Sequence, residues 1–279
     1  MGIFKAFRSK TTQALANEVA ANQGNGGNIR VSAPTHSTNA PARSVTLRKE
    51  SAPATQRSVV LEKGGVDLAK KFDKAGISLS KRNLDGIRAE AVLIADYSGS
   101  MHRDYANGTV QKIVERALGF SLQIDIDGKI PVIRFGSDVF EPVEVTMANY
   151  QNVTATQLTK GMMGSTNLAA ALRVLLDEAA VTESPIFAVI VTDGAPDSEA
   201  AVETLVRQLS HYPVFLKFVS IQPVSFLKKL DKLPGRLVDN VNSQHISDVQ
   251  GMTDSDFAEA MTAEWDKWIA AATLAGVLR

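Results

Sequence analysis

The chain has 279 residues, 44% of them hydrophobic, so it can form one large or two small domains with a sizeable core. It has no cysteine, which excludes a disulfide framework, thiol catalysis and thiolate metal sites and fits a reducing cytoplasm. The net charge is zero, but residues 1–60 carry eight basic and two acidic residues, which leaves the remainder acidic; because phosphates would repel that remainder, we expect no nucleic-acid partner.

The first 58 residues are predicted to be a flexible basic arm. Residues 22–58 are rich in Asn, Gly, Ser, Thr, Ala and Pro, a composition that buries too little apolar surface to offset the entropy of ordering. In residues 1–20 the large apolar side chains fall on one side of a possible short helix: Ile3, Phe4, Phe7 and Leu15. This segment either contacts a membrane surface or a partner, or is a frayed, solvated tail. Because no apolar run approaches the roughly 20 residues that span a bilayer, and no signal peptide is recognisable, we expect a cytoplasmic protein.

Residues 59–87 are predicted to be a short strand-like segment. The pattern apolar-x-Leu-x-Lys occurs four times, at 45–49, 59–63, 66–70 and 77–81. At a period of two, the apolar residue, Leu and Lys share one face of a strand. The repeats at 45–81 therefore either dock on an exposed sheet edge of a partner or reflect strand propensity or coincidence. The Gly-Val-Asp-Leu and Gly-Ile-Ser-Leu-Ser-Lys forms resemble the opening strands of tellurium-resistance D-type stress domains.

From residue 88 to 279, apolar runs alternate with amphipathic patterns. This alternation predicts an α/β fold, a doubly wound, mainly parallel six-stranded sheet with helices on both faces. The turn at 135–139 predicts that the third strand is antiparallel at an edge. We expect strands at 89–95, 130–136, 139–145, 186–192, 213–221 and 236–241, and helices at 104–123, 147–158, 167–180, 197–210, 224–232 and 254–277.

Oxygen-bearing side chains follow two of these strands and begin one helix. Carboxylates and hydroxyls without His or Cys suit Mg²⁺, Mn²⁺ or Ca²⁺ rather than zinc or copper. The alternative is that Asp and Ser only cap a helix beginning near Asp104, which would explain one loop and not three. The three segments are Asp96-Tyr97-Ser98-Gly99-Ser100, Gly164-Ser165-Thr166 and Thr192-Asp193-Gly194.

In this order the three segments resemble the metal-ion-dependent adhesion site of von Willebrand factor A-type (vWA) domains, over residues 88–279. The resemblance implies that Ser98, Ser100 and Thr166 bind a divalent ion directly, and that Asp96 and Asp193 bind it directly or through water. An Asp or Glu of a protein partner would complete the shell. Together with the repeats, this suggests an interaction module of a tellurium-resistance-like bacterial stress system. The expected partner-binding rim comprises Tyr97, His102, Arg103, Met162, Met163, Ala195, Pro196 and Asp197.

The alternative function is a metal-dependent phosphoester hydrolase that uses Asp96 and Asp193. We expect no enzyme, because a haloacid-dehalogenase-type phosphatase needs a second Asp two positions after its nucleophile, and Ser98 stands there. Ser98 also lacks a Gly-x-Ser-x-Gly context, and no Gly-x-x-x-x-Gly-Lys-Ser/Thr phosphate loop occurs.

Overall fold

A computed structural model describes residues 40–279, and the expected helix within residues 1–20 lies outside them. The strands are β1 (Arg48–Lys49), β2 (Ile87–Arg88), β3 (Glu90–Asp96), β4 (Lys129–Phe135), β5 (Val143–Thr146), β6 (Ile186–Thr192), β7 (Val214–Ser220) and β8 (Val241–His245). The helices are α2 (Arg57–Lys81), α3 (His102–Ala106), α4 (Thr109–Ile124), α5 (Leu168–Ala179), α6 (Glu199–Leu209), α7 (Ser225–Asp231), α8 (Asp254–Thr262) and α9 (Trp265–Leu274). A 3₁₀ turn, η1 (Gly99–Met101), and a π-helical turn, η2 (Thr154–Leu158), complete the set.

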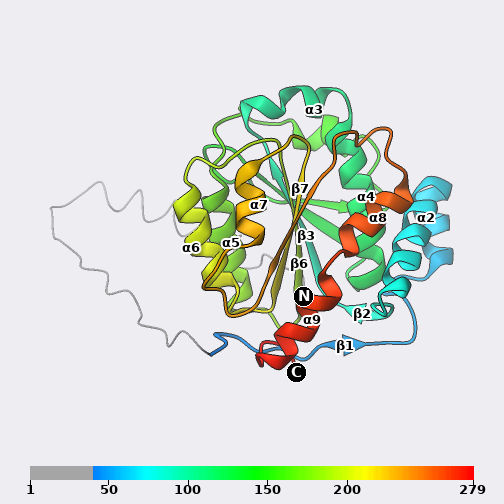
Figure 1. Cartoon of the computed structure of the whole chain (residues 1–279). Helices are drawn as coiled ribbons and strands as arrows, with labels where there is room; N and C mark the ends of the chain where they lie inside the picture. The colour runs from blue at the N-terminus through cyan, green and yellow to red at the C-terminus, as the bar shows by residue number, and fades with distance from the viewer. Residues whose placement is uncertain (1–39) are drawn as a thin grey trace, which may run out of the picture.

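The six-stranded sheet has the order β5-β4-β3-β6-β7-β8 and is parallel except for β5 (Figure 1). Helices α2, α4, α8 and α9 cover one face, and α5, α6 and α7 cover the other. The predicted doubly wound α/β fold with an antiparallel edge strand is therefore confirmed. The chain moves outward in one direction after β3 and in the other after β6, so their carboxyl ends flank the crevice where open sheets of this type bind ligands.

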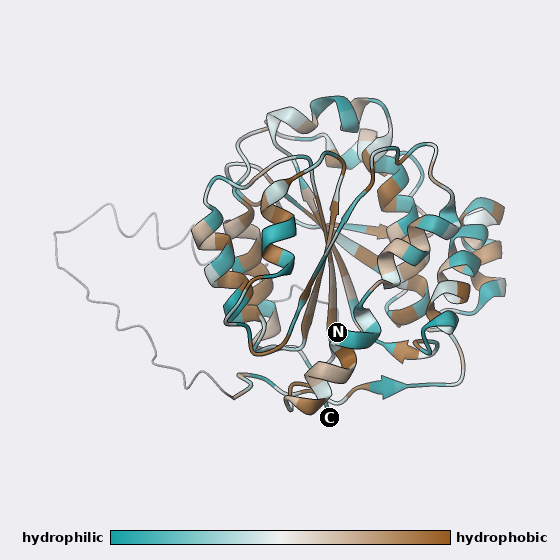
Figure 2. Cartoon of the chain, viewed as in Figure 1, coloured by the Kyte–Doolittle hydropathy of each residue, from teal (hydrophilic) through white to brown (hydrophobic). Residues whose placement is uncertain are grey.

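The strands are the most apolar part of the molecule (Figure 2) because both of their faces are covered. On the α2 side, a cluster of aromatic rings joins the sheet to α4 and α9. Phe187 lies 4.9 Å from Phe120 and 4.7 Å from Trp265, measured between ring centroids. Within the described residues, no helix combines the length and apolar composition needed to cross a bilayer.

Two predicted helices are each broken in two. The range 104–123 becomes α3 and α4 because Gly108, between them, has a φ of +85°. The range 254–277 becomes α8 and α9 at Glu264, whose φ is +66°. Both values lie in the left-handed region, which a continuous helix does not enter. The breaks are local backbone events that the apolar periodicity does not record.

Three other predicted elements are displaced or shortened. Only η2 is helical in the range 147–158, and its first residues form turns instead. The edge strand expected at 139–145 begins at Val143, and β8 begins where the strand expected at 236–241 ends. Short edge strands have one unpaired side, so their limits depend on local turns more than on burial.

The prediction of a flexible arm up to residue 58 is wrong for residues 40–58. This stretch runs along the amino-terminal side of the sheet, where β1 pairs with β2 (Figure 1). Val45 is 4% exposed and forms a parallel bridge with Leu278; Val45 N donates to Val277 O at 3.1 Å. Arg43 Nε donates to Thr182 O at 2.9 Å. We call residues 42–49 the basal strap.

The prediction of a strand-like segment at 59–87 is also wrong, because three of the four repeats lie in α2. These three repeats are helical and do not form the expected docked strand, whereas the repeat at 45–49 is extended and pairs with β2 and the last residues of the chain. The buried side chains of α2 recur every three to four residues over most of its length, which is the spacing of one helix face. They include Leu68, Phe72, Ala75 and Leu79. A kink at Gly65, with a φ of +78°, separates the first two turns from the rest.

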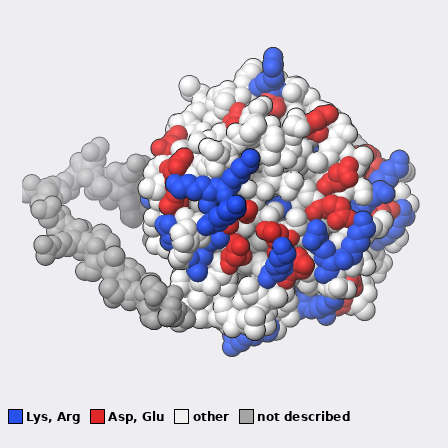
Figure 3. Space-filling view, in the orientation of Figure 1, with Lys and Arg blue, Asp and Glu red and all other residues white. Residues whose placement is uncertain are grey.

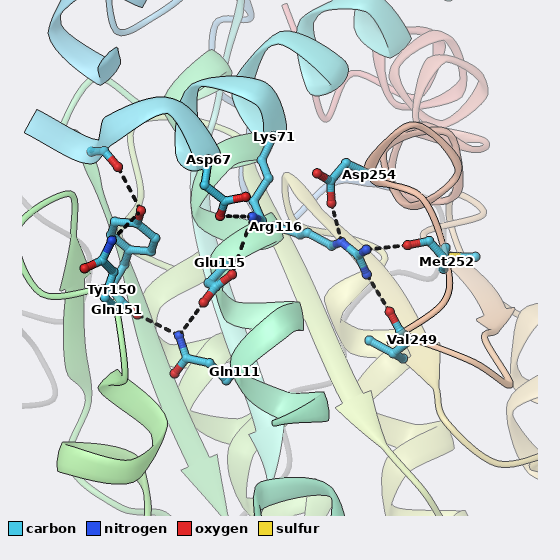
Figure 4. A network of polar contacts seen from close by, with 11 residues as sticks. Asp67, Lys71, Gln111, Glu115, Arg116, Tyr150, Gln151, Val249, Met252 and Asp254 are labelled. Atoms are coloured by element: carbon cyan, nitrogen blue, oxygen red, sulfur yellow. Dashed lines mark hydrogen bonds and ion pairs between the residues drawn. The ribbon is translucent and has the colours of Figure 1, made fainter. Parts of the chain in front are cut away.

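Polar contacts hold α2 against α4 (Figure 4). Lys71, on α2, is 5% exposed and pairs with Asp67 on its own helix and with Glu115 on α4, the latter at 3.5 Å. Tyr150 Oη donates to Gly64 O at 2.8 Å, where the helix kinks. A buried ammonium between two carboxylates keeps its charge compensated, so these contacts fix the helix without leaving an isolated charge.

The neighbouring residue of α4, Arg116, ties the segment before α8 to the same layer (Figure 4). Its guanidinium pairs with Asp254 at 2.7 Å and donates to the carbonyl oxygens of Val249 and Met252. The side chain is 3% exposed. Because each of these bonds is made by a charged donor, they are stronger than neutral hydrogen bonds.

One basic side chain is buried inside the sheet. Lys217, in the middle of β7, is 0% exposed, and its Nζ donates to Asn242 Oδ1. Asn242 in turn donates to Glu264 Oε2 at 2.8 Å, at the break between α8 and α9. Burial lowers the pKa of Lys217 to about 7, although Glu264 and Asp231 act in the opposite direction.

Candidate metal centre

Asp96 ends β3 with a fully buried carboxylate. It is 0% exposed, and each of its oxygens accepts a hydrogen bond: Oδ1 from Ser98 N at 2.8 Å, and Oδ2 from Thr192 Oγ1 at 2.6 Å. Burial raises the pKa of Asp96, while the hydrogen bonds from Thr192 and Ser98 lower it. No ion pair joins this carboxylate to a basic side chain anywhere in residues 40–279. The carboxyl group of Asp96 therefore lies under the crevice without a basic side chain of this range beside it.

Two serine hydroxyls connect β3 to the end of β6. Ser98 Oγ lies 3.1 Å from Ser100 Oγ, and Ser100 Oγ donates to Asp193 Oδ1 at 2.8 Å. The 3₁₀ turn η1 produces this convergence, because Met101 N bonds back to Ser98 O and turns the chain within three residues. Ser98 is 3% exposed, whereas Ser100 is exposed. The hydroxyl–carboxylate row thus runs from the buried strand to the surface.

The Gly164 loop lies against the same turn. Gly164 N donates to Tyr97 O at 3.2 Å, and Gly164 O accepts from Gly99 N at 3.0 Å. A side chain does not fit at Gly164, because its Cβ would lie 2.5 Å from Ser137 N. Thr166, two residues further on, is fixed by its backbone to the segment that follows β6: its carbonyl accepts from Asp197 N at 3.0 Å.

The structure thus brings the three predicted segments to one edge of the sheet. Asp96, Ser98, Ser100 and Asp193 form one hydrogen-bonded row through Ser98, and Thr166 joins that edge through backbone contacts. Sequence reasoning gave no role to Thr192, whose hydroxyl bonds Asp96. The signal was present, since Thr192 ends an apolar run directly before an Asp, where a strand tip faces the crevice.

The expected rim is only partly on the surface. Tyr97 is 3% exposed, so its prediction as a partner contact is wrong: its ring points into the core layer. His102 and Arg103 are exposed. Met162 is 88% exposed, but Met163 packs partly against the core. Ala195 is exposed, whereas Pro196 is buried.

Asp197 is exposed, but its carboxylate is already engaged within the chain. Oδ1 accepts from Thr166 N at 2.9 Å, and Oδ2 accepts from Ser165 Oγ at 2.6 Å. These bonds, with the one from Asp197 N to Thr166 O, brace the second loop against the third. Asp197 therefore supports the geometry of the edge, whatever partner approaches it.

The donor set is chemically specific. Within residues 40–279, no three His, Asp or Glu side chains gather closely enough to hold a metal ion by themselves. A cation at the end of β3 would thus rely on hydroxyls as much as on carboxylates. Such a set of oxygen ligands suits hard cations such as Mg²⁺ and Ca²⁺. The hydrolase alternative loses support here, because Asp96 is buried and both of its oxygens accept hydrogen bonds, which leaves it poorly placed to attack a phosphorus atom.

The comparisons agree with this architecture. Residues 88–278 match the family model vWA-TerF-like, described as the vWA found in the TerF C terminus. The uncharacterized protein YcbR of Bacillus subtilis (strain 168) is 30% identical over 223 residues, which cover 77% of this chain and 90% of YcbR.

Three solved structures are similar at lower identity. A von Willebrand factor type A protein from Catenulispora acidiphila gives a TM-score of 0.44 at 15% identity, over 63% of this chain and 42% of that one. Manganese-loaded TRAP from Plasmodium vivax gives 0.43 at 19%, over 63% and 72%. Proximal thread matrix protein 1 from the mussel byssus, with a zinc-occupied MIDAS motif, gives 0.44 at 14%, over 63% and 46%. The chain spans less than half of the first and third of these proteins. By its family match and by its relative YcbR, the chain belongs to the vWA family found in the TerF C terminus.

Proposed function

We propose that the chain is a metal-dependent protein-interaction module in which a partner carboxylate completes the coordination of a divalent cation. Mg²⁺ is the ion we propose, with Mn²⁺ or Ca²⁺ as substitutes. The observation that carries the proposal is the row of oxygens from Ser98 through Ser100 to Asp193 at the carboxyl ends of β3 and β6. The direct ligands would be Ser98, Ser100 and Thr166, and Asp96 and Asp193 would bind directly or through water.

The residues present fit such an ion. Asp96 is a buried carboxylate without a basic partner in the described part of the chain, so a cation beside Ser98 would compensate its charge when it is ionised. When bound, the ion supplies a positively charged site that an outside carboxylate oxygen can join. The chain's own groups do the rest: Asp193 orients the Ser100 hydroxyl, and Asp197 holds the Thr166 backbone.

The surroundings favour a protein partner. His102, Arg103 and Met162 are exposed and would offer two polar groups and one flexible apolar side chain around a partner's acid. On the face seen in Figure 3, Lys and Arg side chains are interspersed with Asp and Glu. Around α7, for example, Lys229 pairs with Glu203 at 3.0 Å. Mixed charge of this kind gives phosphate groups little attraction, and we propose no nucleic-acid partner.

The setting is part of the same proposal. The family match to the TerF C terminus supports a role in a tellurium-resistance-like stress system, and the cysteine-free sequence supports a cytoplasmic location. We propose a binding role rather than catalysis.

The test is Mn²⁺ binding to the full chain, followed by the electron paramagnetic resonance of free Mn²⁺. Ser100→Ala should weaken binding by roughly tenfold or more, because a hydroxyl of the row is lost. Ser80→Ala is the control: it removes an exposed hydroxyl of α2, outside the three segments of the proposed centre. Equal affinity of wild type and Ser100→Ala would refute the metal site.

The carboxylate step has its own readout. Water-proton relaxation of the Mn²⁺-loaded protein should fall when acetate is added, because acetate would displace a bound water. The Ser80→Ala variant should respond as the wild type does. If the relaxation does not change at acetate concentrations well above those that affect free Mn²⁺, the bound ion has no coordination position for a partner's carboxylate.

A further inference from the structure

Tyr97 separates Asp96 from Ser98 in the first segment of the proposed centre, and its side chain is enclosed by aromatic rings. The Tyr97 ring meets Tyr105 edge-on at 5.0 Å and Phe140 edge-on at 5.4 Å, between centroids. Such edge-to-face pairs restrict the orientation of the ring. Its hydroxyl is consequently held in one direction, toward the carbonyl oxygens of Thr159 and Gly161.

A buried arginine completes this cluster. The Arg134 guanidinium carbon lies 4.9 Å from the Tyr97 ring centroid and 4.5 Å from that of Phe140. Arg134 is 5% exposed and forms no ion pair with a carboxylate among the described residues. Its charge is met instead by the faces of the rings and by carbonyl oxygens.

Four consecutive backbone carbonyls, at residues 158–161, lie where η2 ends. Arg134 binds the first and third of them, and Tyr97 contacts the second and fourth. Arg134 Nη1 donates to Leu158 O at 2.9 Å and Lys160 O at 2.6 Å, and Tyr97 Oη lies 2.8 Å from Thr159 O and 3.1 Å from Gly161 O. The end of a helical turn has unpaired carbonyls, and here two side chains satisfy them.

The same tyrosine also holds the loop further along. Its backbone carbonyl accepts from Gly164 N at 3.2 Å, three residues after Gly161. Gly161 itself has a φ of +94°, and a Cβ there would lie 2.7 Å from Phe140 Cε1, so the chain is pressed against the cluster. Tyr97 thus fixes both ends of the 161–164 stretch, directly before the Thr166 loop.

We propose that Tyr97, supported by Arg134, is a positioning residue of the metal centre: it holds the 158–164 loop against the Ser98 turn and thereby sets where Thr166 meets the ion. This inference rests on the proposed function, because it assigns Tyr97 a role in the same centre. It replaces the earlier expectation that Tyr97 contacts a partner. Tyr97 touches neither ion nor partner in this role and acts through Thr166.

The test compares Tyr97→Phe with Tyr105→Phe in the full chain. Both variants lose one hydroxyl from the same cluster and keep the ring, but the Tyr105 hydroxyl is buried without a hydrogen-bond partner in the described region. Tyr97→Phe should weaken Mn²⁺ binding by about tenfold, the effect of removing a group that orients a ligand. In the metal-free protein, hydrogen exchange should accelerate in residues 158–166 only. Tyr105→Phe should change neither quantity.

A double-mutant cycle with Thr166→Ala separates positioning from general destabilisation. If Tyr97 acts through Thr166, Tyr97→Phe should change Mn²⁺ affinity less than twofold in the Thr166→Ala background. A full tenfold loss there, wild-type affinity in Tyr97→Phe alone, or an equal loss in Tyr105→Phe would each overturn the inference. Failure of the proposed function is recognised separately, because the wild-type protein itself would then not bind Mn²⁺.

Discussion

Replacing Lys217 with Met should stabilise the protein at pH 6 and lose that advantage as the pH rises. The ammonium is 0% exposed and its main polar contact is Asn242. Burial lowers the pKa of Lys217 from 10.5 to about 7. Between these values the unfolded chain binds more protons than the folded one, so this group makes stability rise with pH there. Below pH 7 the cost of burying the charge is fully present.

The magnitude follows from the same pKa values. The gap between 7 and 10.5 corresponds to about 5 kcal/mol of destabilisation below pH 7. Between pH 6 and pH 9.5 this cost falls by about 3 kcal/mol. Methionine removes the cost at every pH but leaves Asn242 Oδ1 without its donor, a penalty of about 1–3 kcal/mol. The variant should therefore be more stable by about 2–4 kcal/mol at pH 6 and close to the wild type at pH 9.5.

Urea unfolding followed by circular dichroism at both pH values measures the difference between the two proteins. Groups that do not interact with Lys217 cancel in that difference; Glu90 is one, since its pKa, which burial raises to about 8, does not depend on Lys217. Lys228→Met, on the exposed side of α7, is the matched control and should show no pH-dependent gain. An advantage of the Lys217 variant that stays constant from pH 6 to pH 9.5 would refute the reasoning.

Three other experiments test the basal strap, the Gly164 loop and the hydrolase alternative. The chain without residues 1–56 should melt at a temperature roughly 6–12 °C lower than the chain without residues 1–39, because the basal strap buries Val45 and supplies backbone hydrogen bonds. Equal melting temperatures of the two truncated proteins would mean that the strap does not stabilise the domain. Gly164→Ala should destabilise by about 1–3 kcal/mol, since a Cβ meets Ser137 at 2.5 Å, whereas Gly99→Ala has open space and should be neutral in urea unfolding. Mg²⁺-dependent hydrolysis of p-nitrophenyl phosphate should not exceed the buffer rate; turnover abolished by Asp193→Asn would restore the hydrolase alternative.

The central strands were predictable because burial on both faces leaves a plain signal. The run at 186–192 is seven buried residues, and β6 occupies that range. Tyr97 shows a signal that was present and not used. Ala91, Leu93 and Ala95 face the core cluster on the α2 side, and strand alternation places Tyr97 on that same side. The unusual aromatic between Asp96 and Ser98 thus belongs to the interior.

Two regions were mispredicted for different physical reasons. In α2, the Leu-x-Lys repeats suggest a period of two, but Leu68, Phe72, Ala75 and Leu79 recur at helical spacing, and this second pattern decided the fold. The basal strap is short and polar in sequence, and its order comes from carbonyls at Val277 and Arg279, far along the chain. Such pairing depends on tertiary contacts that local composition does not encode. Arg134 went unnoticed because a lone basic residue in a strand gives no sign of the carbonyls it will meet.

The basal strap and the proposed metal centre lie at opposite ends of the sheet. Leu47 N donates to Arg279 O at 2.8 Å, so the strap and the last residues of the sequence are stitched together beneath the amino ends of the strands. The oxygen row lies at the opposite end of β3, roughly 20 Å away for a seven-residue strand. A protein fused behind residue 279 would therefore be attached at the end opposite the oxygen row and would not cover the proposed metal site. The domain can thus be anchored at the end that carries the basal strap, while the end that carries the oxygen row stays accessible to a partner.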